Sequence, residues 1–141
     1  MNLVVQTGPV GEPVSLTVAK EHLRVDHSAD DALLTSQIIT ARDWAETFTR
    51  RAFVSRTYDL YFDRWPRFPL QLPHPPLVSV TGIWYTDEDG TETEYDSSNY
   101  LVSANSQPGR IALKSMATLP AVTLQEVDGV RVRFVAGYGN A

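Results

Sequence analysis

The sequence predicts an α+β fold, in which one short and one long N-terminal helix precede a mainly antiparallel β-sheet with a protruding hairpin. Apolar residues recur at helical spacing over residues 15–52 and alternate with polar residues over residues 53–139. Asp89-Gly90 marks a tight hairpin turn. Because 141 residues is a usual size for one domain, we expect a single domain over residues 15–141, preceded by an extended arm over residues 1–14.

The short helix follows a segment rich in helix breakers. Four breakers precede it, namely Gly8, Pro9, Gly11 and Pro13, and they favour an extended arm. Ser15 and Thr17 then offer hydroxyl groups that cap helices. We predict a two-turn helix from Val18 to about Arg24.

The long helix is the clearest element in the sequence. Ser28 is a good N-cap, and Asp30 and Asp31 in the first turn suit the positive end of the helix dipole. Arg50 and Arg51 suit the negative end. Between these ends an apolar stripe runs along one face, and we expect it to pack against other elements of its own subunit or against a neighbouring copy: Leu34, Ile38, Ala41, Ala45 and Phe48.

Strand periodicity begins after this helix. The short repeats of polar and apolar residues, separated by Pro- and Gly-containing turns, predict an antiparallel sheet. A proline-rich crossover over residues 73–76 cannot be helical, and an acidic hairpin tip occupies residues 87–90. The predicted strands cover residues 58–62, 70–72, 77–85, 91–95, 100–102, 110–113 and 130–135.

Composition and charge limit the possible functions. Hydrophobic residues make up 43% of the chain and charged residues 21%, as in ordinary globular domains. The 12 basic and 17 acidic side chains give a net charge of -5, whereas non-specific DNA binding needs an excess of positive charge. Since the chain has no cysteine, Cys-ligated zinc and disulfides are excluded. We expect neither a signal peptide nor a membrane segment, since no basic leader or long apolar run is present.

No motif indicates catalysis, a cofactor or a metal. His22, His27 and His74 lack the spacing of a zinc-binding helix. The acidic run over residues 87–92 does not follow the calcium-loop pattern, and Gly137-Tyr138-Gly139 lacks the remainder of a phosphate-binding loop. We therefore expect no enzyme activity, no cofactor and no metal site.

Arginine and aromatic residues interleave between residues 50 and 68. Such a mixture suits a protein interface, where Trp, Tyr and Arg concentrate binding energy, and it also suits single-stranded nucleic acid. The net negative charge favours the protein interface. Together with the acidic hairpin, this gives eight candidate partner-binding residues: Arg56, Arg64, Trp65, Arg67, Trp84, Asp87, Glu88 and Asp89.

Six fragments in a fixed order together resemble the head-tail connector (adaptor) proteins of long-tailed bacteriophages and of gene transfer agents. The fragments include an "AK-x-HLRVD" helix, a "DDALL" helix start, an "LP-x-PPL-x-SV" crossover and strand, a "Y-x-D-x-DG" hairpin, a "PGRI" turn and a final "F-x-AGYG". They begin at residues 19, 30, 72, 85, 108 and 134. The resemblance therefore extends over most of the chain.

The resemblance implies a structural role without catalysis. It implies a homo-oligomeric ring of about a dozen copies, closed by head-to-tail contacts, beneath the portal protein and around the channel through which genomic DNA passes without sequence recognition. A stopper or tail terminator protein is the implied partner on the tail side. The implied location is the head-tail junction of a virion or virus-like particle, with assembly in the bacterial cytoplasm.

Two further expectations come from the comparison with that family. Relatives commonly continue past "AGYG" into one or two amphipathic helices, whereas this chain ends at Asn140-Ala141, so we expect it to lack that segment. The alternative function is a nucleic-acid-binding accessory of DNA packaging, which would use the arginine-aromatic stretch over residues 50–68. Strong DNA binding with a steep salt dependence would favour that alternative.

Overall fold

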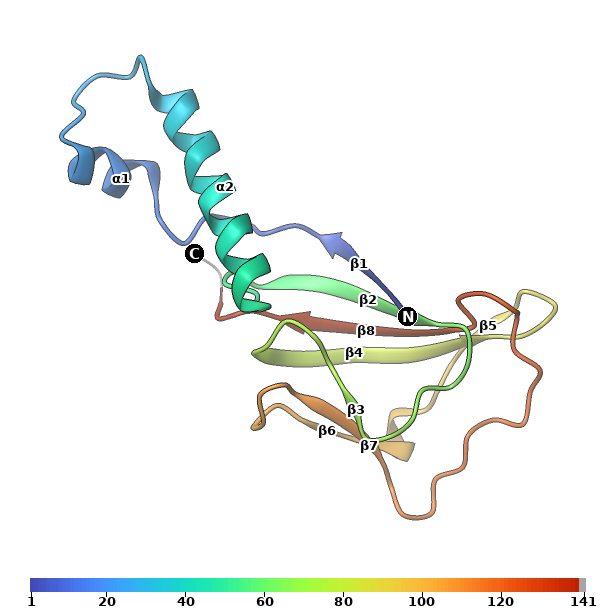
Figure 1. Cartoon of the computed structure of the whole chain (residues 1–141). Helices are drawn as coiled ribbons and strands as arrows, with labels where there is room; N and C mark the ends of the chain where they lie inside the picture. Colours follow the sequence, from blue (N-terminus) through green and yellow to red (C-terminus); the bar gives the residue numbers. More distant parts are fainter. Residues whose placement is uncertain (140–141) are drawn as a thin grey trace.

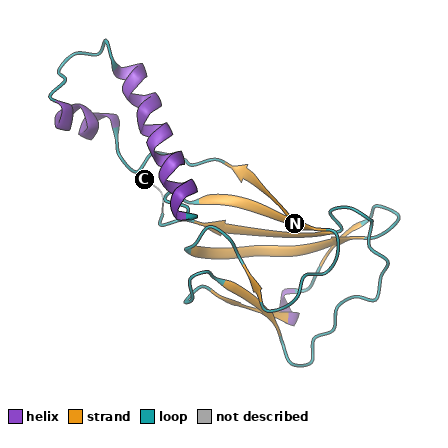
Figure 2. Cartoon of the chain, viewed as in Figure 1, coloured by secondary structure: helices purple, strands orange, loops and turns teal. Residues whose placement is uncertain are grey.

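The computed structural model describes residues 1–139 and confirms the predicted α+β class, with two helices followed by mainly antiparallel strands (Figures 1 and 2). The helices are α1 (Leu16–Leu23) and α2 (Asp31–Thr49). The strands are β1 (Asn2–Thr7), β2 (Arg56–Phe62), β3 (Leu70–Gln71), β4 (Leu77–Thr86), β5 (Glu92–Glu94), β6 (Tyr100–Ser103), β7 (Arg110–Leu113) and β8 (Val130–Ala136). A 3-10 turn, η1 (Ser97–Asn99), precedes β6.

The strands form two sheets with the hydrophobic core between them. The larger sheet has the order β1-β2-β8-β4-β5 and the smaller one the order β3-β7-β6, and all described pairs are antiparallel. Alternate residues of each strand point to the same face, so the inner face of β2 and β8 is apolar. The completely buried residues include Leu60, Ile83, Ile111, Val132 and Phe134.

Strand β1 was not expected from the sequence. The N-terminal arm begins with six residues that pair with β2 as an edge strand, with Leu3 opposite Leu60 and Val5 opposite Tyr58. The breakers from Gly8 onward end this strand rather than exclude it. The extended segment that remains runs from β1 to α1.

The two helices begin and end close to the predicted positions. The Ser15 side chain accepts a hydrogen bond from the Val18 backbone N–H at 3.3 Å, which confirms it as the cap of α1. The expected cap of α2 at Ser28 is wrong, because the helix begins at Asp31 and no side chain caps it. Arg50 ends α2 in the left-handed conformation, with φ 54°.

The helices extend beyond the end of the sheets instead of covering a sheet face (Figure 1). We call α1, α2 and their connection the helical arm. Within it the predicted apolar stripe is only partly covered: Leu34 is buried, whereas Phe48 is 75% exposed. Within one subunit the stripe is therefore packed only in part, and packing of the remainder against a neighbouring copy stays a prediction. Over residues 1–139, neither helix is long and apolar enough to cross a membrane.

Candidate interaction surfaces

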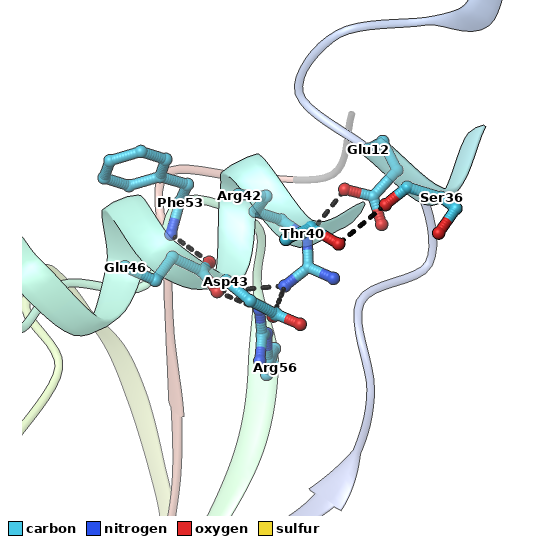
Figure 3. Close-up of polar contacts among 8 residues, drawn as sticks. All are labelled: Glu12, Ser36, Thr40, Arg42, Asp43, Glu46, Phe53 and Arg56. Carbon is cyan, nitrogen blue, oxygen red and sulfur yellow. Dashed lines mark hydrogen bonds and ion pairs between the residues drawn. The ribbon is translucent and has the colours of Figure 1, made fainter. Parts of the chain in front are cut away.

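A buried ion-pair network joins the helical arm to the sheet (Figure 3). Arg42 of α2, with its side chain 5% exposed, donates from Nε to Glu12 Oε2 at 2.6 Å and from Nη1 to Glu46 Oε2 at 3.0 Å. Glu46 also accepts hydrogen bonds from the Phe53 backbone N–H at 2.7 Å and from Arg56 on β2. The network thus connects the N-terminal segment, α2 and the first residue of β2.

The neighbouring carboxylates favour the charged form of Arg42. The hydrogen bond to Glu12 raises the pKa of Arg42 above its ordinary value, although burial acts in the opposite direction. Breaking a buried pair leaves an uncompensated charge and typically costs about 3–5 kcal/mol. We infer that the network fixes the direction in which the helical arm leaves the sheet.

An apolar groove lies between the two helices. Its volume is about 400 Å³, and its walls include Ala19 and Leu23 of α1 and Leu34 and Ile38 of α2. Beside the groove, Trp44 and Phe48 stack with ring centroids 5.3 Å apart and are 67% and 75% exposed. Side chains four residues apart on a helix are neighbours, so the spacing of these two aromatics was visible in the sequence, but their exposure was not.

The predicted hairpin is formed by β4 and β5, which confirms the acidic tip. The Asp87 carboxylate accepts hydrogen bonds from the backbone N–H groups of Asp89 at 3.1 Å and Thr91 at 2.8 Å, which shapes the turn. Glu88 and Asp89 are exposed. The segment before β8 runs beside the tip, because the Glu88 N–H donates to the Thr123 carbonyl at 3.0 Å.

This end of the large sheet gathers further carboxylates. The Asp128 backbone N–H donates to Asp63 Oδ1 at 3.1 Å, so the turns after β2 and before β8 meet here. Glu126 lies in the same segment and is exposed. We call the hairpin tip and these carboxylates the acidic end; it consists of Asp63, Asp87, Glu88, Asp89, Glu126 and Asp128.

A cleft of about 570 Å³ lies at the opposite end of the sheets. Residues from the end of α2, from the crossover before β4 and from the turn before β7 line it, including Arg50, Arg51, Gln71 and His74. Arg51 Nη1 donates to Gln107 Oε1 at 2.9 Å and to the Tyr138 hydroxyl at 2.7 Å. We call it the basic cleft.

His74 is the partly buried histidine of this cleft. Its ring stacks on Tyr58, with centroids 5.3 Å apart and planes 5° from parallel. Burial lowers the pKa of His74 below its ordinary value, and the nearby Arg56 charge acts in the same direction, whereas Glu46 opposes it. His74 therefore contributes a stacked ring to the cleft, and burial favours its neutral form.

The eight candidate partner-binding residues are dispersed. Arg56 belongs to the buried network, and Trp65 packs against Tyr85 and Tyr95 at centroid distances of 5.6 and 5.5 Å. Both therefore make their main contacts within the subunit. Arg64 and Arg67 are exposed in the loop after β2. The three acidic candidates, Asp87, Glu88 and Asp89, form the hairpin tip.

The last candidate, Trp84, lies on the outer face of the large sheet. Arg131 covers its ring, with the guanidinium carbon 4.4 Å from the ring centroid. Beside it, Arg133 makes two hydrogen bonds, at 2.7 and 2.6 Å, to the completely buried Asp59. The arginines of this face are thus neutralised by carboxylates of the same subunit. The alternation of Arg131 and Arg133 with apolar residues in the sequence predicted a strand with one polar face.

None of these surfaces forms a metal centre. Across residues 1–139, no three His, Cys, Asp or Glu side chains converge as a metal site would require. The polar groups instead pair with one another or line open surfaces. This arrangement is suited to binding macromolecules through extended surfaces.

Comparison with known proteins gives a family and a set of structural relatives. Residues 13–111 match the family described as phage gp6-like head-tail connector protein. No curated protein sequence matches the chain. Among solved structures, one similar chain comes from the neck of an empty gene transfer agent (GTA) particle, computed with C6 symmetry. The two chains superpose with a TM-score of 0.81 and are 26% identical, and the match covers 99% of this chain and 72% of that one.

Two further structures are similar. A chain in the virion of a native GTA particle gives a TM-score of 0.77 at 28% identity, covering 99% of this chain and 73% of that one. A chain in the neck of a native GTA particle, computed with C12 symmetry, gives a TM-score of 0.72 at 28% identity, covering 99% and 71%.

Proposed function

Because the chain belongs to the phage gp6-like head-tail connector family, we propose that it forms a ring beneath the portal that joins the DNA-filled head of a phage or gene transfer agent particle to its tail. The family is structural, and its role as a connector is the premise of this proposal. The observation that carries it is the superposition of 99% of the chain on a subunit of a GTA particle neck. The cyclic symmetry of such necks supports a ring for this chain as well.

The surfaces of the subunit are consistent with this role. The helical arm leaves an apolar groove and two stacked aromatics uncovered, and large apolar patches of this kind mark interaction sites. The two ends of the sheets carry opposite charge, which suits head-to-tail contacts between identical subunits. Exposed Arg64 and Arg67 remain candidates for contacts with neighbouring proteins.

We assign three kinds of contact to the proposed ring. Identical subunits lie on either side, the portal protein lies above, and a stopper or tail terminator protein lies below. Genomic DNA passes through the centre without sequence recognition, since the net charge of -5 disfavours tight DNA binding. Assembly takes place in the bacterial cytoplasm and the product resides at the head-tail junction.

Mass photometry of the purified protein, alone and with the portal protein of the same particle, tests this proposal. We expect the portal to recruit multiple copies and to give a discrete complex whose added mass is a multiple of the subunit mass of 15.7 kDa. Recruitment follows from the high effective concentration of subunits docked side by side. A portal that stays free of the chain over a wide concentration range would contradict the proposed function.

A further inference from the structure

Two pairs of charged residues that the fold leaves without an oppositely charged partner lie far apart on the subunit. Among residues 1–139, Arg42, Arg56, Arg131 and Arg133 each lie within 4.0 Å of a carboxylate. Arg50 and Arg51 of the basic cleft have no such partner in that part of the chain, and neither do Glu88 and Asp89 of the acidic end. These two arginines and these two carboxylates therefore lie at two different places.

These two places lie at opposite ends of one strand. His74 in the crossover leads into the first residue of β4, and the acidic tip follows the last residue of β4. Ten residues of strand extend over roughly 33 Å. One subunit therefore cannot bring its own hairpin tip into its own basic cleft, whereas two subunits placed end to end can.

We propose that the basic cleft of one subunit receives the acidic hairpin tip of the next copy, and that this contact is a subunit contact of the ring. The proposal rests on the proposed function, since it assumes that copies of this chain associate. The contact does not involve Arg56 or Trp65, because both make their main contacts within the subunit.

The chemistry of the two partners is complementary. The cleft is lined by Arg50 and Arg51 together with Leu72 and Pro73, and its volume of about 570 Å³ accommodates a tight turn. The hairpin presents Glu88 and Asp89 on a turn that Asp87 holds in shape. Arginine pairs well with carboxylates because its planar donors form two parallel hydrogen bonds. A contact of one end with the opposite end of the next copy is heterologous and closes into a ring when the rotation permits.

The absence of cysteine from the chain allows a direct test by disulfide trapping. Gln71→Cys lies in the cleft and Thr91→Cys beside the hairpin tip, and both positions are exposed and uncharged. In the double variant, each copy can be linked to two others. Oxidation in the presence of the portal protein should therefore give a ladder of dimers, trimers and higher species on a non-reducing gel, whereas each single variant should give none.

A matched control carries the same number of cysteines on the helical arm. Val18→Cys lies on α1 and is 54% exposed, so the pair Gln71→Cys and Val18→Cys should not give the ladder. Arg50→Glu and Arg51→Glu added to the trapping pair should reduce the ladder about tenfold, since like charges across a contact repel. Adding Glu88→Arg and Asp89→Arg should then restore it, which would also show that the charge-reversed cleft is folded.

The outcomes separate this inference from the proposed function. A wild-type chain that assembles on the portal, together with a trapping pair that yields no ladder, would overturn the hairpin-cleft contact and leave the ring intact. The same holds if charge reversal has no effect on the ladder. A wild-type chain that does not assemble at all contradicts the ring itself.

Discussion

At the scale of single residues, Arg42 shows how one charged side chain holds distant parts of the chain together. The sequence places it beside the predicted apolar stripe of α2, where a solvent-exposed role is the simplest interpretation. The structure buries it because its partner Glu12 comes from a segment 30 residues earlier and because Glu46 also binds Arg56. Long-range pairing of this kind cannot be predicted from local spacing.

We predict that Glu46→Gln destabilises the fold by about 3 kcal/mol, because among residues 1–139 it removes the one carboxylate within 4.0 Å of Arg56 and one of the three within 4.0 Å of buried Arg42. Urea unfolding measures this loss as a lower midpoint at unchanged slope. Asp43→Asn is the matched control, because Asp43 also binds Arg42 but its side chain is 59% exposed. The control should cost less than about 1 kcal/mol, and equal losses for both variants would contradict the idea that burial makes the difference.

His74 gives a pH prediction. Since burial lowers its pKa in the folded state, the unfolded chain binds more protons as the pH falls through the ordinary value of 6.5. The contribution of neutral His74 to the stability of the fold is therefore complete above pH 6.5. It is lost as the pH decreases toward the lower pKa of the folded state. His74→Gln should flatten the pH dependence of unfolding in this range, and His22→Gln, at an exposed position on α1, is the control for loss of a histidine.

At the scale of secondary structure elements, local signals determined what could be predicted. The hairpin follows from Asp89-Gly90 between alternating segments, and α2 follows from its helical period. Strand β1 was missed because its partner β2 lies about fifty residues later, and pairing over such a distance leaves no local pattern. The stripe of α2 was found, but helical period alone does not reveal which part of the stripe another element covers.

The two ends of that stripe should respond differently to truncation. Leu34→Ala removes a side chain that is 7% exposed and should cost about 2–3 kcal/mol. Phe48→Ala removes a larger side chain that is 75% exposed and should cost less than about 1 kcal/mol in the isolated chain. Thermal or urea unfolding of both variants provides the measurement, and a larger loss for Phe48→Ala would show that the helical arm packs differently in solution.

Substitution of half-buried Ile38 should cause a loss of stability between those of a core residue and an exposed residue. The sequence alone predicts a strong effect of Ile38→Asp, as for a charge placed in a core. Because Ile38 lines the open groove, the new carboxylate remains in contact with water and the loss should be nearer that of an ordinary partly buried site, about 1 kcal/mol. The difference between these two values can be resolved in the same unfolding series.

At the scale of the whole molecule, the family and the architecture were predicted better than the interaction surfaces. Dispersed sequence fragments were sufficient to predict the family, because they occur in the family's order over most of the chain. The candidate surfaces required three-dimensional placement: Arg56 and Trp65 turned out to serve the subunit itself, whereas Arg50, Arg51 and His74 come together from separate segments. The acidic hairpin was recognisable because all of its residues are adjacent in the chain.

The charge distribution also predicts how tightly the isolated protein binds DNA. Six of the 17 Asp and Glu side chains lie within 4.0 Å of a Lys or Arg among residues 1–139, so part of the basic charge is already neutralised: Glu12, Asp31, Asp43, Glu46, Asp59 and Glu92. Arg50 and Arg51 remain near one end, but a net charge of -5 opposes the approach of a polyanion.

We therefore expect weak binding of the isolated chain to double-stranded DNA near physiological salt, with no preference for sequence. Fluorescence anisotropy of a labelled duplex, titrated with protein at several salt concentrations, gives both the affinity and the salt slope. Arg50→Glu with Arg51→Glu should reduce any residual binding, since these two arginines of the basic cleft have no carboxylate within 4.0 Å in residues 1–139. Arg24→Glu on the helical arm is the control, because it makes the same change of charge at an exposed arginine. Tight binding whose logarithm falls steeply with the logarithm of salt concentration would mean that several phosphates are neutralised, and would favour the packaging accessory over the connector.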